Sequence, residues 1–140
     1  MSINGTYILE KNGENFDKLL EAWGVPSEVI SKVMGSRRRM TLLDQQESQV
    51  TVHSEFAAEG CDFDSSRPPL IYTLSFDKES ILNIFGVEMK INQKLSGNSI
   101  KGSATLSGKE MMSVYVFSDD GFTFTGTCDG ISAQTIFKRQ

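Results

Sequence analysis

The sequence offers few residues that could perform catalysis or bind a metal. His53 is the single histidine, and no serine or carboxylate close to it in the chain has the spacing of a catalytic triad. Cys61 and Cys128 lack C-x-x-C spacing, and with one histidine they cannot complete a zinc site without carboxylates. Residues 62–66 resemble a calcium loop but lack its central glycine and final glutamate. We therefore predict no catalytic residue, no metal site and no cofactor.

Three consecutive arginines form the most prominent charge cluster. Arg37, Arg38 and Arg39 directly follow the second of two predicted helices. One interpretation is a solvated turn, slightly stabilised by the placement of cations near a helix C-terminus. The other is contact with anionic membranes, to which each basic residue near the surface contributes about 1 kcal/mol. The net charge of −4 argues against generic nucleic-acid binding, which usually needs a strongly basic surface.

Size and composition predict a single domain, residues 1–140, which we expect to be monomeric. No run of residues approaches the ~18 consecutive apolar positions that a membrane span needs. Residues 1–5 carry neither the basic nor the apolar region of a signal peptide. These features predict a cytoplasmic protein in which both cysteines stay reduced.

The elements that position these residues begin with two short helices, confined to residues 15–35. The first has an apolar stripe at positions i, i+3, i+4 and i+7, formed by Phe16, Leu19, Leu20 and Trp23. The second has Ser27 as its expected N-cap and an apolar stripe formed by Val29, Ile30, Val33 and Met34. Pro26 separates the two, because proline disfavours helix for the residue before it. The pattern predicts a helix-turn-helix of two apolar-faced helices.

The remaining chain predicts β-strands, one before the helices and nine after them. Glycine, asparagine and aspartate occupy the breaks between the later strands, and the strands recur about every ten residues, which is typical of an antiparallel up-and-down meander. We expect the long polar connection from residue 57 to 69 to be a mobile surface loop. The predicted strands are 6–9, 40–43, 50–56, 70–76, 80–85, 87–95, 100–106, 111–117, 122–128 and 131–137.

The alternation of side chains along these strands points to a semi-polar interior. From Phe122 to Cys128 the phenylalanines share one face with Gly126, and three threonines share the other. Other strands interleave polar groups with aromatic ones on a single face. A closed barrel of about ten strands can hold one small ligand, so the pattern predicts a cavity. The alternative is a solid sandwich core whose polar residues face water.

The order of elements resembles the fatty-acid-binding protein family. Residues 5–7, 14–17, 19–20 and 24–25 are similar to the family's opening G-x-W, E-N-F-D and G-V pattern, with Tyr7 in place of tryptophan. Residues 129–132 and 136–139 look like its final hairpin and strand. Similarity is good over residues 3–40 and 86–140 and poor between them. The resemblance implies an all-β fold, a ten-stranded up-and-down antiparallel β-barrel capped by a helix-turn-helix lid. It also implies transport of a hydrophobic small molecule such as a fatty acid, a retinoid or another lipid.

The resemblance also indicates where this chain departs from its family. The family holds a carboxylate through two inward arginines and a tyrosine on its late strands. Aligned without gaps from the C-terminus, these positions fall on Tyr115, Thr135 and Phe137. A buried carboxylate needs a charged partner or it protonates. The ligand is therefore expected to be neutral, or its carboxylate to be held elsewhere, near the portal.

The lining residues carried over from the family, or from the inward strand faces, are predicted to contact the ligand. Plain packing is the alternative for each of them. A different function is also open: a ligand-poor barrel, nearly filled by Tyr115, Phe122, Phe124 and Phe137, that acts as a protein-interaction module. An isomerase is a distant third. The predicted ligand-binding set is Phe16, Leu19, Leu20, Val29, Val33, Met40, Tyr115, Phe117, Phe124, Thr135 and Phe137.

Overall fold

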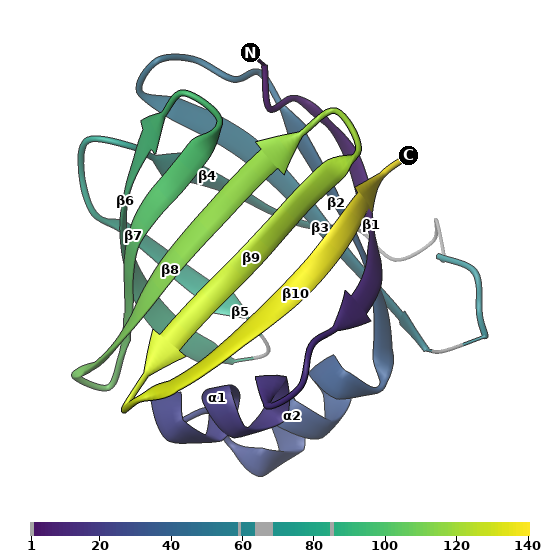
Figure 1. Ribbon diagram of the computed structural model, residues 1–140, viewed down its shortest axis with the longest axis vertical. Helices are drawn as coiled ribbons and strands as arrows, with labels where there is room; N and C mark the ends of the chain where they lie inside the picture. The colour runs from purple at the N-terminus through teal and green to yellow at the C-terminus, as the bar shows by residue number, and fades with distance from the viewer. Residues whose placement is uncertain (1, 59, 64–68, 85) are drawn as a thin grey trace.

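The computed structural model describes residues 2–58, 60–63, 69–84 and 86–140, with the side chain of Ile84 left out. Two helices and ten strands make up this part of the chain (Figure 1). The helices are α1 (Phe16–Trp23) and α2 (Ser27–Met34). The strands are β1 (Gly5–Asn12), β2 (Ser36–Leu43), β3 (Gln49–Ala58), β4 (Leu70–Ser75), β5 (Ser80–Ile84), β6 (Val87–Ser96), β7 (Ser99–Leu106), β8 (Lys109–Ser118), β9 (Gly121–Cys128) and β10 (Ile131–Arg139).

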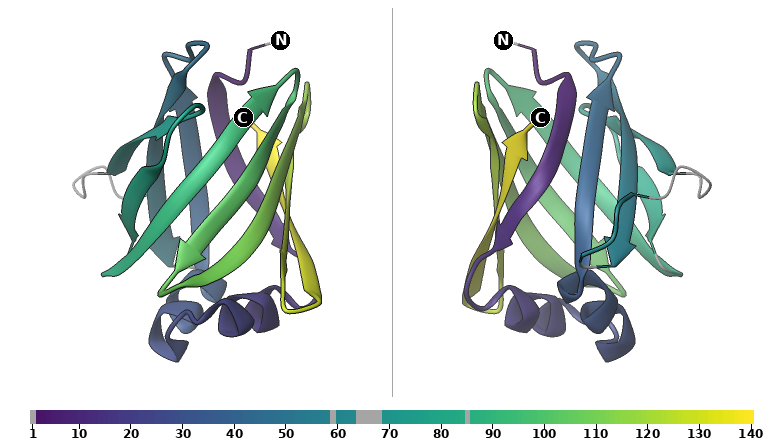
Figure 2. Two further views of the ribbon diagram at one scale, coloured as in Figure 1. Left: turned by 90° about the vertical axis from the view of Figure 1, so that its left-hand side faces the viewer. Right: turned by 90° about the vertical axis from the view of Figure 1, so that its right-hand side faces the viewer.

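All ten strands belong to one antiparallel sheet, in the order β4-β3-β2-β1-β10-β9-β8-β7-β6-β5. The sheet curls into a barrel, and β4 and β5 stand at its two edges (Figures 1 and 2). Among the described residues no backbone pairing joins these two edges, so the barrel is nearly closed. The prediction of a ten-stranded up-and-down barrel with a helical lid is confirmed.

The two helices lie side by side across one end of the barrel (Figure 2). All four residues of the predicted stripe on α1 are buried, whereas α2 has no buried residue. The prediction that Ser27 caps α2 is wrong, because Pro26 occupies the cap position and Ser27 is the first helical residue. The lid therefore has one firmly packed helix and one loosely packed helix.

Trp23 fastens the packed helix to the barrel wall. Its indole Nε1 donates to the carbonyl oxygens of Ala104 and Lys109, each at 3.0 Å. These carbonyls belong to β7 and β8, the strands whose connecting turn lies beside α1 (Figure 1). A single side chain thus ties the C-terminal end of α1 to the rim of the barrel.

An aromatic cluster fills the interior between β1 and the late strands. Phe122 stacks on Phe137 with ring centroids 4.6 Å apart, and it meets Phe117 at 5.0 Å and Tyr7 at 5.1 Å. The hydroxyl of Tyr7 donates to the carbonyl of Ile3 at 2.8 Å. These contacts hold the start of β1 against the ends of β8, β9 and β10.

The long connection expected between residues 57 and 69 is described only in part. β3 continues to Ala58 and β4 begins at Leu70. Asp64 and Arg67, which we placed in a mobile loop, lie outside the described residues, as does most of the run that resembles a calcium loop. In the described part of the chain, Cys61 is exposed, Cys128 is buried, and neither forms a disulfide.

The described residues contain no group of three or more histidine, cysteine or acidic side chains placed to hold a metal ion. No described helix is both long enough and apolar enough to cross a membrane.

Candidate ligand-binding cavity

A cavity of about 230 Å³ lies inside the barrel, beneath the helical lid. Side chains from both helices and from strands on every side of the barrel line it, and most of them are apolar. Pockets for small molecules typically measure about 300–1,000 Å³, so this cavity is somewhat smaller than usual. It suits a slim or compact hydrophobic molecule, or a larger one that pushes the lid outward.

The structure brings ten of the eleven predicted ligand-binding residues to the wall of this cavity. The exception is Leu19, which is 0% exposed and packs against β9. A Cβ atom added to Gly126 would lie 2.8 Å from Leu19 Cδ2, so the glycine makes room for this leucine. Ligand contact remains a prediction for the other ten, which are Phe16, Leu20, Val29, Val33, Met40, Tyr115, Phe117, Phe124, Thr135 and Phe137.

The placement of the arginine cluster corrects the sequence interpretation. One of the two interpretations of residues 37–39 is a solvated turn, but β2 begins at Ser36 and includes all three arginines. Successive residues of a strand face opposite sides of the sheet. Arg38 therefore shares the inward face with Met40, and both line the cavity. The interpretation as a turn is therefore wrong for all three arginines, and Arg38 lies inside the cavity rather than outside it.

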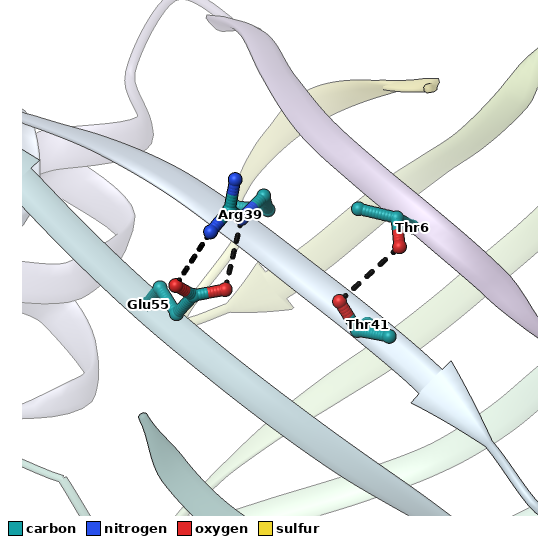
Figure 3. A network of polar contacts seen from close by, with 4 residues as sticks. All are labelled: Thr6, Arg39, Thr41 and Glu55. Carbon is teal, nitrogen blue, oxygen red and sulfur yellow. Dashed lines mark hydrogen bonds and ion pairs between the residues drawn. The ribbon is translucent and has the colours of Figure 1, made fainter. Parts of the chain in front are cut away.

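Arg37 and Arg39 point to the outer side of the sheet and have partners there. Figure 3 shows Arg39 beside Glu55 of β3, with Arg39 Nε and Nη2 donating to the two carboxylate oxygens at 2.8 and 2.7 Å. This bidentate pair lowers the pKa of Glu55. The same view shows the outer face continuing through Thr41, whose hydroxyl lies 3.3 Å from that of Thr6. Arg37 donates to the carbonyl oxygen of Cys61 at 2.6 Å.

Arg38 is placed between the lid and the barrel wall. Its guanidinium carbon lies 5.5 Å from the ring centroids of both Phe16 on α1 and Phe137 on β10. Its Nη2 donates to Oδ1 of Asn12, the last residue of β1, while its Nε is buried and has no hydrogen-bond partner among the described residues. Burial lowers the pKa of Arg38 to about 10, and the hydroxyl of Tyr115 acts in the opposite direction. The side chain therefore stays cationic at neutral pH.

Among the described residues, no carboxylate balances this charge within the cavity. Among the described lining residues, Arg38 is the only one that carries a formal charge. The ion pairs of the described chain involve Arg39, Lys109 and Lys138, not Arg38. Its nearest polar companions are neutral groups, so the cavity contains a net positive charge beneath its lid.

Further polar side chains belong to this wall or lie directly beside it. Gln93 Nε2 donates to the hydroxyl of Ser113 at 3.5 Å, and the hydroxyls of Tyr72 and Ser54 lie 3.3 Å apart. Burial raises the pKa of both Tyr72 and Tyr115, so these phenols stay protonated.

Unpartnered polar atoms remain in this lining. They are Gln93 Oε1 and Thr135 Oγ1, in addition to Arg38 Nε. A buried polar atom without a partner is costly, so each of these atoms calls for a polar group from an occupant or from ordered water.

Sequence reasoning missed several of the polar lining residues. Arg38 could have been found by extending the alternation back from Met40 by two residues, because both positions then face the same side. Gln93 could be found in the same way from Ile91, an apolar neighbour on the inward face of β6. Tyr72 and the apolar wall of β4 and β5 lie where the resemblance is poor, so no motif marks them.

Comparison with known proteins supports the same fold and family. No protein-family model matches the chain. Across 143 aligned positions, covering all of both proteins, it is 25% identical to the intestinal fatty acid-binding protein of Rattus norvegicus. The solved Schistosoma mansoni fatty acid binding protein, in complex with arachidonic acid, has a TM-score of 0.80 at 17% identity over 98% of this chain and 95% of that one. The fatty-acid-binding protein of Manduca sexta has a TM-score of 0.79 at 14% identity over 99% of each chain.

Proposed function

We propose that this chain, which is similar over its full length to a fatty acid-binding protein, is a carrier that takes a hydrophobic small molecule into its barrel. The observation that carries this proposal is the mainly apolar cavity beneath the lid. Burying the apolar surface of a ligand there contributes about 25 cal/mol for each Å² removed from water. Binding and release, without chemical change to the ligand, are the whole of the proposed activity.

We further propose that the protein acts in the cytoplasm, as a monomer and as one lipid-binding domain. Its similarity to the rat protein extends over the full length of both chains, which supports a single functional unit. The ligand is a fatty acid, a retinoid or another lipid, which is either neutral or has its head group held in an unusual way. The positions aligned with the family's carboxylate-binding residues are Tyr115, Thr135 and Phe137, none of which is charged.

The first test is to identify what the protein carries. Native mass spectrometry of the freshly purified protein is expected to show one bound molecule, and organic extraction should release a lipid. The bound mass should disappear after delipidation and return when the extracted lipid is added back. Recovery of the unliganded mass alone, with no uptake from a panel of fatty acids, retinoids and neutral lipids, would contradict the carrier function.

A second candidate function is favoured by the small size of the cavity. At about 230 Å³, the interior could be a nearly filled barrel that serves as a protein-interaction module. This alternative predicts that no lipid binds and that added lipid leaves the unfolding temperature unchanged. A carrier instead gains stability in proportion to the logarithm of ligand concentration, because ligand binds the folded state alone.

We propose that delivery involves transient contact with anionic membranes through the outer face of β2 beside the lid. Arg37 is the residue best suited to this contact, since Arg39 is paired with Glu55. At low salt, R37Q is expected to slow ligand transfer to anionic vesicles about fivefold, the equivalent of about 1 kcal/mol for one basic residue. A fluorescent fatty acid and vesicles that contain a quencher would measure the rate.

The controls for this prediction distinguish the effect of a positive charge near the lid on the transfer rate from the effect of the net charge of the protein. K101Q removes an exposed cation from β7 and should leave the transfer rate unchanged. Transfer by the parent protein should slow as salt rises, because ionic screening at physiological salt acts within about 8 Å. Equal transfer rates for R37Q and the parent at low salt would leave Arg37 without a role in delivery.

A further inference from the structure

We propose that Arg38 holds the anionic head group of the ligand, directly beneath helix α1, so that this carrier binds hydrophobic acids through a cation on β2. The inference rests on the proposed carrier function and specifies its ligand class. Three observations carry it: Arg38 lines the cavity, it is the only charged side chain among the described lining residues, and its Nε is buried without a partner.

The charge of Arg38 is costly to the empty protein. A cation removed from water needs an opposite charge or several hydrogen bonds to offset its lost hydration. Among the described residues it has one hydrogen bond, to Asn12, and it contacts the rings of Phe16 and Phe137. Ring faces attract a cation but do not neutralise it. The missing component is an anion, and the cavity is where one can enter.

A second donor stands near the same place. Thr135 lies directly opposite Asn12 in the pairing of β1 with β10, and its hydroxyl oxygen is buried without a hydrogen-bond partner. Asn12 itself accepts from Arg38. Three adjacent strands thus bring a guanidinium, an amide and a free hydroxyl to one level of the wall. A guanidinium fork and a hydroxyl donor suit a carboxylate, which accepts hydrogen bonds on both oxygens.

The position of Arg38 defines the orientation of the ligand. Phe16 belongs to the lid, so a head group on Arg38 lies under α1 and the apolar body extends into the barrel. The apolar lining and the aromatic cluster around Phe122 then receive the tail. A long-chain fatty acid, with one carboxylate and an otherwise apolar body, meets both requirements.

The test compares oleic acid with methyl oleate, two probes that share the acyl chain and differ in the head group, an anionic carboxylate in one and a neutral methyl ester in the other. The parent protein is expected to bind the acid at least tenfold more tightly than the ester at pH 7.5, as measured by displacement of a fluorescent probe. R38Q should weaken acid binding about 10- to 100-fold, the range for hydrogen bonds to charged groups, and should leave ester binding unchanged. R38K, which keeps the charge and loses the planar fork, should fall between the two.

The control variant is K138Q. It removes an exposed cation from the outer side of β10, next in sequence to Phe137, and should bind both probes as the parent does. Normal binding of the ester by R38Q shows that the variant is folded with its cavity intact. If R38Q does not fold, R38K and the acid-to-ester ratio of the parent protein decide the question.

Each outcome separates the two proposals. Equal affinity of the parent for acid and ester, or unchanged acid binding by a folded R38Q, would overturn the role of Arg38 and leave the carrier function standing. Failure of the parent to bind either probe, or any member of a panel of acids and neutral lipids, would overturn both. A tenfold preference for the acid that R38Q abolishes supports both together.

Discussion

Replacing Phe122 with alanine is expected to lower the free energy of unfolding by about 3–5 kcal/mol. The side chain is 3% exposed, and its ring lies within 4.6–5.1 Å of the rings of Phe137, Phe117 and Tyr7, measured between centroids. The substitution removes the hydrophobic contribution of a whole aromatic side chain and leaves a hole in a close-packed region. Each lost aromatic pair costs about 0.5–1.5 kcal/mol beyond the area that it buries.

Urea titration followed by circular dichroism measures this change. Ile81→Ala is the control, because Ile81 is 61% exposed and its truncation should alter the free energy by less than about 0.5 kcal/mol. The ring of Phe122 also lines the cavity, so the variant should accept bulkier ligands than the parent. A loss of stability no larger than that of the control would show that the aromatic cluster is not part of the stabilising core.

Replacing Trp23 is expected to release the lid. Trp23→Ala removes a buried ring and the indole donor that serves the carbonyls of Ala104 and Lys109, so it should cost about 3–5 kcal/mol in stability. Ligand release should become faster, because α1 then loses its attachment to β7 and β8. Stopped-flow dilution of a preloaded fluorescent fatty acid would measure the release rate.

Two further variants distinguish the contribution of the indole donor from that of the buried ring, and the contribution of α1 from that of α2. Trp23→Phe keeps most of the ring and loses the donor, so its cost should be about 1–3 kcal/mol, the penalty for buried acceptors left without a partner. Met34→Ala on α2 should change little, since that helix has no buried residue and Met34 is exposed. If Trp23→Ala released ligand at the rate of the parent, the ligand would leave by a route that does not involve α1.

The strands were predictable because their turns have a distinct chemistry. Asp129 and Gly130 both have positive φ, 51° and 77°, as do Ser107 and Gly108, at 49° and 81°. Two consecutive positive φ values define the tight turn that best matches the twist of a hairpin, and glycine is the residue that adopts it without strain. A polar residue followed by glycine between apolar runs therefore fixes both the turn and the register of the strands around it.

The chemistry of the cavity was less predictable, because it depends on where a strand begins. Three consecutive arginines after a helix are compatible with a solvated turn, and the hydrophobic pattern predicts a strand only from Met40 onward. β2 in fact begins at Ser36, since its backbone pairs with β3 as far as Ala58. A charged residue on an inward face contradicts the hydrophobic pattern, and such conflicts concentrate at functional sites. The charge of Arg38 on an otherwise apolar inward face therefore marks this position as a candidate functional site.

The order of the strands also bears on how the protein folds. β1–β4 and β5–β10 are two local meanders, and among the described strand pairs only β1 with β10 joins strands that are not consecutive in the chain. The pairing of β1 with β10, which we call the seam, places Tyr7 opposite Arg139. Forming the seam closes a loop of nearly the whole chain, which costs about 4 kcal/mol of chain entropy. Hairpins form early and distant pairings late, so we expect the seam to be the slow step.

This division also separates the groups proposed to hold the head group. Asn12 and Arg38 lie in the first meander, and Thr135 lies in the second. Neither meander alone contains all three residues, so they come together only when β1 pairs with β10. A ligand that bridges Arg38 and Thr135 would therefore act as a staple across the seam, and the carrier would be hardest to unfold when it is loaded.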